Sequence, residues 1–145
     1  MIAVDTNILV YAHRKDAPDH EAASTALRDL SEGSTRWAIP WACLHEFMAV
    51  VTRPRYLTTP STQAQASEQI DAWLASPTLT TIAESGRHWL TFGALVAAGN
   101  IVGNQVHDAK IAAVCLDAGV REFWSADRDF SRYPSLRTRN PLVAA

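Results

Sequence analysis

The sequence contains no apolar run long enough to cross a membrane and no basic segment ahead of its first apolar residues, 2–4. A bilayer is spanned by about 20 consecutive apolar residues, and a secretion signal begins with positive charge, so we expect a cytoplasmic protein with no membrane partner. Cysteine is scarce too: Cys43 and Cys115 lie singly in apolar segments, without the CxxC spacing of a zinc site. We expect two reduced thiols in the core and no disulfide.

Positive charge is not in excess either, because 13 Lys and Arg face 15 Asp and Glu, for a formal net charge of -2. Net charge therefore gives no general attraction to nucleic acid. If several of the acids gather in one site, however, the remaining surface becomes mildly basic, which leaves room for a polyanionic substrate. With 145 residues, 48% of them hydrophobic, the chain can bury a core of its own, and we expect residues 1–145 to form a single domain.

Short runs typical of buried strands alternate with longer helical runs, and this alternation predicts an α/β fold with a mainly parallel sheet. The expected strands, four to five in all, are residues 2–4, 37–39, 79–82 and 122–124, with 136–139 as a candidate edge strand. The expected helices are residues 7–11, 16–33, 41–51, 62–74, 87–98 and 107–116, followed by a helical turn at 130–133.

Capping signals and apolar spacing describe these helices further. Thr62 and Gln65 have capping-box spacing, and Gly99 fits the C-cap of the helix that starts at residue 87. Apolar residues that recur every three or four positions indicate the sides that face the core. These are Ala22, Ala23, Ala26, Leu27 and Leu30 in the second helix, Leu44, Phe47, Met48 and Val51 in the third, Ile70, Trp73 and Leu74 in the fourth, and Leu90, Ala94 and Leu95 in the fifth.

Four carboxylates, those of Asp5, Glu46, Asp108 and Asp127, fall at the end of apolar segments or inside them. Burying an unpaired carboxylate is costly, so a chain that repeats this placement favours acids gathered around a cation. In a parallel sheet the residues that follow the strands lie along one edge, where such folds bind ligands. Asp5 and Asp127 are of that kind, and helices can bring Glu46 and Asp108 to the same edge.

Each acid also has a purely structural explanation. Asp5 and Asp108 stand where a helix N-cap is expected, and Asp127 or Asp129 would stabilise an Asx turn after the fourth strand. Glu46 has no Lys or Arg one helical turn away, so the alternatives for it are contact with solvent or with a distant arginine. Because all these acids are expected near one edge of the sheet, we favour a shared site.

Carboxylate ligands without histidine or cysteine favour Mg²⁺, with Mn²⁺ as a substitute, over zinc. A divalent cation would keep the crowded acids ionised, and Asn7 would add a neutral oxygen ligand or an amide that positions water. Such an ion activates water and stabilises the charge of an in-line displacement at phosphorus. The acids therefore predict metal-dependent hydrolysis of a phosphodiester.

Four segments carry a resemblance to a known family. They are MIAVDTNIL at 1–9, WACLHEF at 41–47, VHDAKIAA at 106–113 and WSADRDF at 124–130, followed by RNPL at 139–142. By these segments the chain resembles the PIN-domain ribonucleases and, within them, the VapC-type toxins of bacterial toxin–antitoxin pairs. The similarity runs along nearly the whole chain.

The resemblance implies a three-layer α/β/α sandwich, an endoribonuclease that acts on RNA, a homodimer, and a small cognate antitoxin that covers the active groove. It also implies a Mg²⁺ pocket formed by the carboxylates of Asp5, Glu46, Asp108 and Asp127. Ser125 stands where the family has a hydroxyl near the metal, and Asp129 matches a further acid of some members.

RNA binding also requires cations for the phosphates. Arg128 and Arg132 follow Asp127 closely, and Arg14 is a further candidate. The other basic residues considered are Lys15, Arg53, Arg55, Arg137 and Arg139. We expect Trp41 and Trp73 to pack in the core or in a dimer contact more than to stack on bases.

Two other functions are compatible with the residues. One is a phosphatase that uses Asp5 as a covalent nucleophile, although Asn7 stands where such enzymes usually have a second acid. The other is a non-catalytic module that binds nucleic acid or protein and uses the acids only as caps. Dependence of RNA cleavage on Mg²⁺ separates the nuclease from both.

Overall fold

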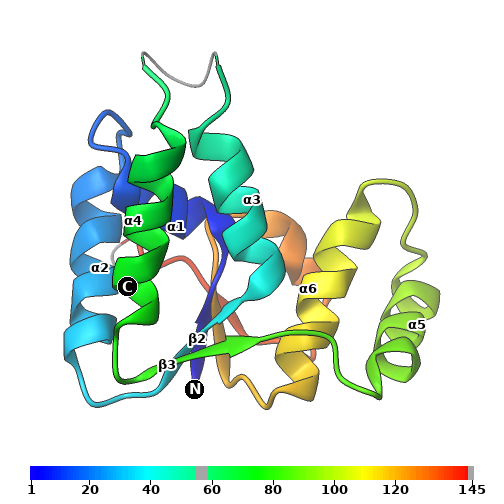
Figure 1. Ribbon diagram of the computed structural model, residues 1–145. Coiled ribbons are helices and arrows are strands. Elements are labelled where there is room, and N and C mark those ends of the chain that lie inside the picture. The colour runs from blue at the N-terminus through cyan, green and yellow to red at the C-terminus, as the bar shows by residue number, and fades with distance from the viewer. Residues whose placement is uncertain (55–58, 144–145) are drawn as a thin grey trace.

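The computed structural model describes residues 1–54 and 59–143, and Arg55 lies outside that part of the chain. Along it, pairs of helices separate the first four strands (Figure 1). In order they are β1 (Ile2–Val4), α1 (Thr6–His13), α2 (His20–Glu32), β2 (Trp37–Pro40), α3 (Trp41–Val51), α4 (Gln63–Leu74), β3 (Leu79–Ile82), α5 (His88–Gly99), α6 (Gln105–Asp117), β4 (Glu122–Trp124), the 3₁₀ helix η1 (Arg128–Arg132) and β5 (Thr138–Arg139).

Within the described residues, five parallel strands form one sheet in the order β3-β2-β1-β4-β5. β1 is central, and Ala3 on it pairs with Ala38 on β2 and with Phe123 on β4. Figure 1 shows α2 and α4 on one side of the strands and α5 and α6 on the other. The structure confirms the predicted three-layer α/β/α sandwich, its mainly parallel sheet and the candidate edge strand, which is β5.

The order of the strands reverses between β1 and β4. The chain first adds β2 and β3 on one side of β1 and then adds β4 and β5 on the other. At such a switch point the connections after the two strands leave toward opposite faces of the sheet, and a crevice forms beyond the carboxyl ends of the strands. Asp5 leaves β1 here, with its backbone N–H donating to the carbonyl of Trp124 at 2.9 Å, and Ser125 leaves β4.

The predictions for α3 and α4 are largely confirmed. α3 spans residues Trp41–Val51 as expected and buries Phe47 completely. The capping box of α4 is formed by bonds of 3.1 Å from the Gln65 N–H to the Thr62 hydroxyl and 2.9 Å from the Thr62 N–H to the Gln65 side chain. Trp73 packs edge-on against Phe47 with ring centroids 4.9 Å apart, as the packing prediction requires. Leu74, expected to face inward, is instead 39% exposed.

The predicted limits of two helices are wrong. α2 begins at His20, and not near residue 16, because the Asp16 carboxylate binds the Arg14 guanidinium and the backbone turns before the helix starts. Ala22, expected on the inward side of α2, is exposed. At the other helix, Gly99 is still helical and Asn100 ends α5 with a left-handed φ of 49°. Asparagine tolerates that conformation because its short side chain bonds locally.

The inward side predicted for α5 is also wrong in part. No residue of α5 is buried: Leu90 is 63% exposed, Ala94 is exposed, and Leu95 is partly buried against the core. α5 lies at the periphery beside α6 (Figure 1), which is its main contact among the described helices and strands, so much of this apolar helix remains uncovered. In the described part of the chain, no helix is both long enough and apolar enough to span a membrane. Cys43 and Cys115 are buried and free, as expected.

Candidate active site

Asp5 directly follows β1 at the switch point and is 8% exposed. Its Oδ1 accepts hydrogen bonds from the backbone N–H of Thr6 at 2.8 Å and from the thiol of Cys43 at 3.7 Å. Its Oδ2 accepts from the hydroxyl of Ser125 at 2.7 Å and from the amide of Asn7 at 3.4 Å. The bond from Thr6 confirms the capping role considered for Asp5, and the same carboxylate is fixed between β1 and β4.

Asn7 and Ser125 join the loops that leave β1 and β4. Asn7 Oδ1 accepts from the backbone N–H of Ala126 at 3.1 Å, while its Nδ2 lies 3.4 Å from Ser125 Oγ. Ser125 Oγ also accepts from the backbone N–H of Asp127 at 3.0 Å. The amide of Asn7 therefore joins the two loops, because its Oδ1 accepts from Ala126 and its Nδ2 faces Ser125 and Asp5.

Glu46 is an exposed residue of α3, and its Oε2 accepts a hydrogen bond of 3.0 Å from the hydroxyl of buried Thr6. No Lys or Arg in the described part of the chain forms an ion pair with it, in keeping with the absence of a basic neighbour on its helix. Sequence reasoning missed Thr6. Its one signal was its place directly after Asp5, at the end of the first strand.

Asp108 lies in the first turn of α6, which begins at Gln105, so the capping alternative considered for Asp108 is wrong. Asp127 caps η1 by accepting a bond of 2.8 Å from the backbone N–H of Asp129, which confirms the Asx-turn alternative for Asp127. Asp127 and Asp129 are both exposed. Arg132 Nη1 lies 3.8 Å from Asp129 Oδ1.

Five acids meet at the carboxyl edge of the sheet. A cavity of about 210 Å³ is lined by the four that the sequence singled out, Asp5, Glu46, Asp108 and Asp127. Asp129 joins them more closely than expected, since one oxygen each of Asp108, Asp127 and Asp129 lie within 4.8 Å of one another. We refer to these five residues as the carboxylate cluster.

Crowding and burial disfavour the ionised forms of two of these acids. Desolvation raises the pKa of Asp5 from 3.8 to about 6, although the bonds from Ser125 and Thr6 oppose the shift. Partial burial also raises the pKa of Asp108, with further contributions from the charges of Asp127 and Asp129. The electrostatic free energy of the cluster is therefore improved by any bound cation.

Burial itself explains less than the sequence suggested. Asp5 is buried and Asp108 half-buried, but Glu46 and Asp127 are exposed at the mouth of the cavity. The expectation of four buried carboxylates is correct for Asp5 alone. For Asp5 and Asp108, desolvation is the main cause that disfavours the ionised carboxylate, and like-charge repulsion from neighbouring acids adds to it.

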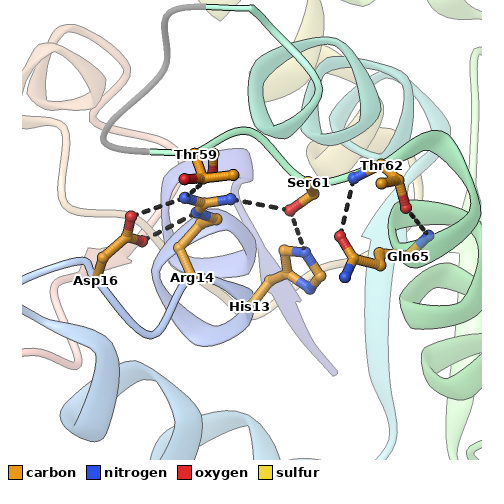
Figure 2. A network of polar contacts seen from close by, with 7 residues as sticks. All are labelled: His13, Arg14, Asp16, Thr59, Ser61, Thr62 and Gln65. Atoms are coloured by element: carbon orange, nitrogen blue, oxygen red, sulfur yellow. Dashed lines mark hydrogen bonds and ion pairs between the residues drawn. The ribbon is translucent and has the colours of Figure 1, made fainter.

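Arg14, expected to contact phosphate, belongs to a separate polar network at the end of α1 (Figure 2). Its Nε and Nη2 donate to the Asp16 carboxylate at 3.0 and 2.7 Å, its Nη1 donates to Ser61 Oγ at 3.1 Å, and its Nη2 also bonds to the carbonyl of Thr59. His13 lies 2.9 Å from the same Ser61 hydroxyl. We call these five residues the Arg14 network and assign Arg14 to structure, because its guanidinium is buried and its three nitrogens have acceptors.

The other RNA-binding candidates lie at the surface. Arg128 and Arg132 are exposed on η1, next to the carboxylate cluster. Trp41, which was expected to pack, is 40% exposed at the start of α3, where its ring lies 6.1 Å from that of His45.

The donor set fits a hard divalent cation. All five members of the cluster offer carboxylate oxygens, and in residues 1–54 and 59–143 neither histidine nor cysteine lines the 210 Å³ cavity, so the ligand chemistry matches Mg²⁺ or Mn²⁺ better than zinc. The raised pKa values of Asp5 and Asp108 support the same reading, since a bound cation offsets the cost of ionising both.

Comparisons with known proteins agree with this geometry. The family model of the PIN domain matches residues 2–136. The chain is 37% identical over 142 residues to VapC ribonuclease Mb2897 of Mycobacterium bovis, a match that covers 98% of this chain and 96% of that protein.

Two solved structures share the fold. One, VapBC2 of Rickettsia felis bound to a DNA fragment from its promoter, matches at a TM-score of 0.71 and 24% identity, covering 97% of this chain and 98% of that one. The other, a toxin–antitoxin complex from Klebsiella pneumoniae, matches at a TM-score of 0.62 and 19% identity, with 97% and 98% covered.

Proposed function

Because the chain belongs to the PIN domain family and, within it, to the VapC ribonucleases, we propose that it is a Mg²⁺-dependent endoribonuclease and the toxin of a toxin–antitoxin pair. The observation that carries the proposal is the carboxylate cluster. Five acids meet at one edge of the sheet, and among the described residues the one basic side chain paired with any of them is that of Arg132, at 3.8 Å. Such a site is suited to a cation and, through it, to a phosphate.

We assign Mg²⁺ to Asp5, Glu46, Asp108 and Asp127, with Asp129 as an additional or alternative ligand. When bound, the ion supplies Lewis-acid activation of water and stabilises negative charge on the phosphoryl oxygens. The protein contributes rigidity: four hydrogen bonds fix the Asp5 carboxylate, and Thr6 holds Glu46. Ligands held this firmly lose little conformational freedom when the site is filled.

Substrate and partners follow from the relatives. We propose that single-stranded or looped RNA is cut and that Arg128 and Arg132 contact phosphates beside the cluster. A small cognate antitoxin would silence the enzyme by covering the groove, and the chain would act as a homodimer in the cytoplasm. The relative VapC ribonuclease Mb2897 is a ribonuclease by name, and the Klebsiella pneumoniae structure of the same fold is a toxin–antitoxin complex.

The phosphatase alternative is disfavoured by the environment of Asp5. Such enzymes usually have a second acid two residues after the nucleophile, whereas this position holds Asn7, whose amide bonds to Ala126 and to the Asp5 carboxylate. A purely structural role for the acids explains Asp5 and Asp127, which are caps, but leaves Glu46 and Asp108 without a reason to lie beside them.

The decisive experiment follows cleavage of a labelled, structured RNA by the folded protein with and without Mg²⁺, and compares Asp5→Asn and Glu46→Gln with wild type. We expect cleavage to require the metal and both substitutions to abolish it while the protein stays folded. Growth supplies a second readout, because expression of wild type alone should be poorly tolerated and that of Asp5→Asn should not. Metal-independent cleavage that persists in both variants would exclude the proposed site.

A further inference from the structure

A second, larger hollow opens from the carboxylate cluster between α3 and α6. Its volume is about 620 Å³, and it is lined on the α3 side by Ala42, His45 and Ala49 and on the α6 side by Asn104, His107 and Lys110. Asp5, Glu46 and Asp108 belong to its lining as well as to that of the 210 Å³ cavity. The two hollows therefore meet at the acids, and we call the larger one the α3–α6 groove.

The two hollows differ in charge. Among the described residues no Lys, Arg or His lines the 210 Å³ cavity, whereas the α3–α6 groove contains Lys110, His45 and His107. A phosphodiester chain crossing the acids needs a metal at the bond that is cut but basic side chains at the neighbouring phosphates, since the acids repel them. Lys110 stands two residues after Asp108, so a cation lies within one helical turn of the acids.

One residue of the groove lining, His45, belongs to an exposed aromatic pair on α3. The ring of Trp41, one helical turn earlier on α3, lies 6.1 Å from the His45 ring at an interplanar angle of 34°. Trp41 is 40% exposed, although its side chain is the largest on α3. Ala42 and Ala49 leave space on this side of the helix. Exposed rings beside a basic side chain are the combination with which proteins hold unpaired nucleotides.

We propose that the α3–α6 groove is the subsite for the nucleotide next to the cleaved bond in single-stranded RNA. Lys110, with His107, contacts the adjacent phosphate, and Trp41 and His45 stack on its base. The inference rests on the proposed nuclease function and adds to it the path of the strand. It also explains why the acids open on two sides: the substrate has to pass across them.

The test measures RNA affinity and cleavage separately. Binding of a fluorescent single-stranded RNA of mixed sequence is followed by anisotropy in the Asp5→Asn background, where no cleavage is expected. We expect Lys110→Met to weaken binding about tenfold and to reduce the slope of log Kd against log salt by about 0.7, the value of one phosphate contact. Lys110→Arg, which keeps the charge, should restore most of the affinity.

Trp41→Ala should weaken binding about tenfold, a typical value for loss of one stacked base, with an unchanged salt slope. The chain supplies matched controls. Arg28→Met removes an exposed basic side chain of α2, and Trp89→Ala removes a side chain of the same type as Trp41 that is 77% exposed on α5, outside the groove. Neither control should alter RNA affinity. In the cleaving protein, the two groove substitutions should raise KM with little effect on kcat.

The outcomes distinguish the inference from the function on which it rests. If wild type cleaves RNA and Lys110→Met and Trp41→Ala bind and cleave as wild type does, the subsite is wrong and the nuclease stands. If wild type does not cleave, the proposed function fails whatever the binding data show. If the groove substitutions change the oligomeric state or antitoxin binding but leave RNA affinity unchanged, the groove is a protein interface and the inference is overturned.

Discussion

The carboxylate cluster and the Arg14 network are both polar, yet they differ in how their charges are compensated. In the Arg14 network the three guanidinium nitrogens have acceptors, and the Asp16 carboxylate receives two of the bonds (Figure 2). In the carboxylate cluster, among the described residues, one of the five acids has a basic partner: Asp129 lies 3.8 Å from Arg132. Buried polar groups that complete their bonds stabilise a fold, while uncompensated charge indicates a site for a ligand.

The comparison also separates two effects on stability. Removal of one partner from a largely buried ion pair leaves the other without compensation, which destabilises the protein. Removal of one carboxylate from a cluster of like charges has the opposite effect, because the loss of repulsion raises the free energy of unfolding. Substitution of Arg14 and substitution of an acid should thus produce opposite patterns in activity and in stability.

The largest expected effect is on catalysis. Asp108→Asn should lower the rate of Mg²⁺-dependent RNA cleavage by about 10³-fold, equivalent to roughly 4 kcal/mol of transition-state stabilisation, because it removes a metal ligand. The free energy of unfolding should stay the same or rise, since Asp108 repels Asp127 and Asp129. Single-turnover cleavage and denaturant unfolding measure the two quantities. A variant that loses stability together with activity would show that Asp108 is a structural residue.

The next effect concerns the Arg14 network. Arg14→Met should lower the free energy of unfolding by about 3 kcal/mol, because the hydrogen bonds from its guanidinium to Asp16, Ser61 and the Thr59 carbonyl are lost. Cleavage by the folded fraction should remain near wild type. Arg28→Met, at an exposed position of α2, is the control and should change stability by less than about 0.5 kcal/mol. If Arg14→Met instead weakens RNA binding and leaves stability unchanged, the phosphate role first expected of Arg14 is correct.

The contrast between the two regions also shows what the sequence was able to predict. The acids were identifiable because strand ends and helix periodicity depend on neighbouring residues, and Asp5 and Glu46 interrupt apolar segments. The hydrogen-bond network of Arg14 could not be identified in this way. Its partners Thr59 and Ser61 are separated from it along the chain by two helices and a strand, and no neighbouring residue distinguishes a buried arginine from a phosphate-binding one. The exposure of α5 was missed for a related reason: its apolar sequence indicates a buried face, but the fold leaves it at the periphery.

A smaller effect is expected from pH. Asp5 has a pKa of about 6 in the folded protein, against an ordinary value of 3.8. Between these values the folded state retains a proton that the unfolded chain has released, so the free energy of unfolding decreases as pH rises from 3.8 through about 6 and then levels off. Metal-free wild type should therefore be more stable at about pH 5 than at about pH 8, by roughly 1–2 kcal/mol relative to Asp5→Asn. If wild type and Asp5→Asn showed the same change in the free energy of unfolding between these two pH values, the raised pKa of Asp5 would be contradicted.

The smallest effect, and the one that compares the two regions most directly, is stabilisation by Mg²⁺. A ligand that binds only the folded state at about five times its Kd raises the free energy of unfolding by about 1 kcal/mol. At about pH 8 we expect this rise in wild type and also in Arg14→Met, because the Arg14 network supplies no ligand. Asp108→Asn should show little of it. Thermal unfolding of the three proteins over a Mg²⁺ titration measures the difference. If Mg²⁺ stabilised Asp108→Asn as much as wild type, the ion would bind elsewhere, and the carboxylate cluster would have a role other than metal binding.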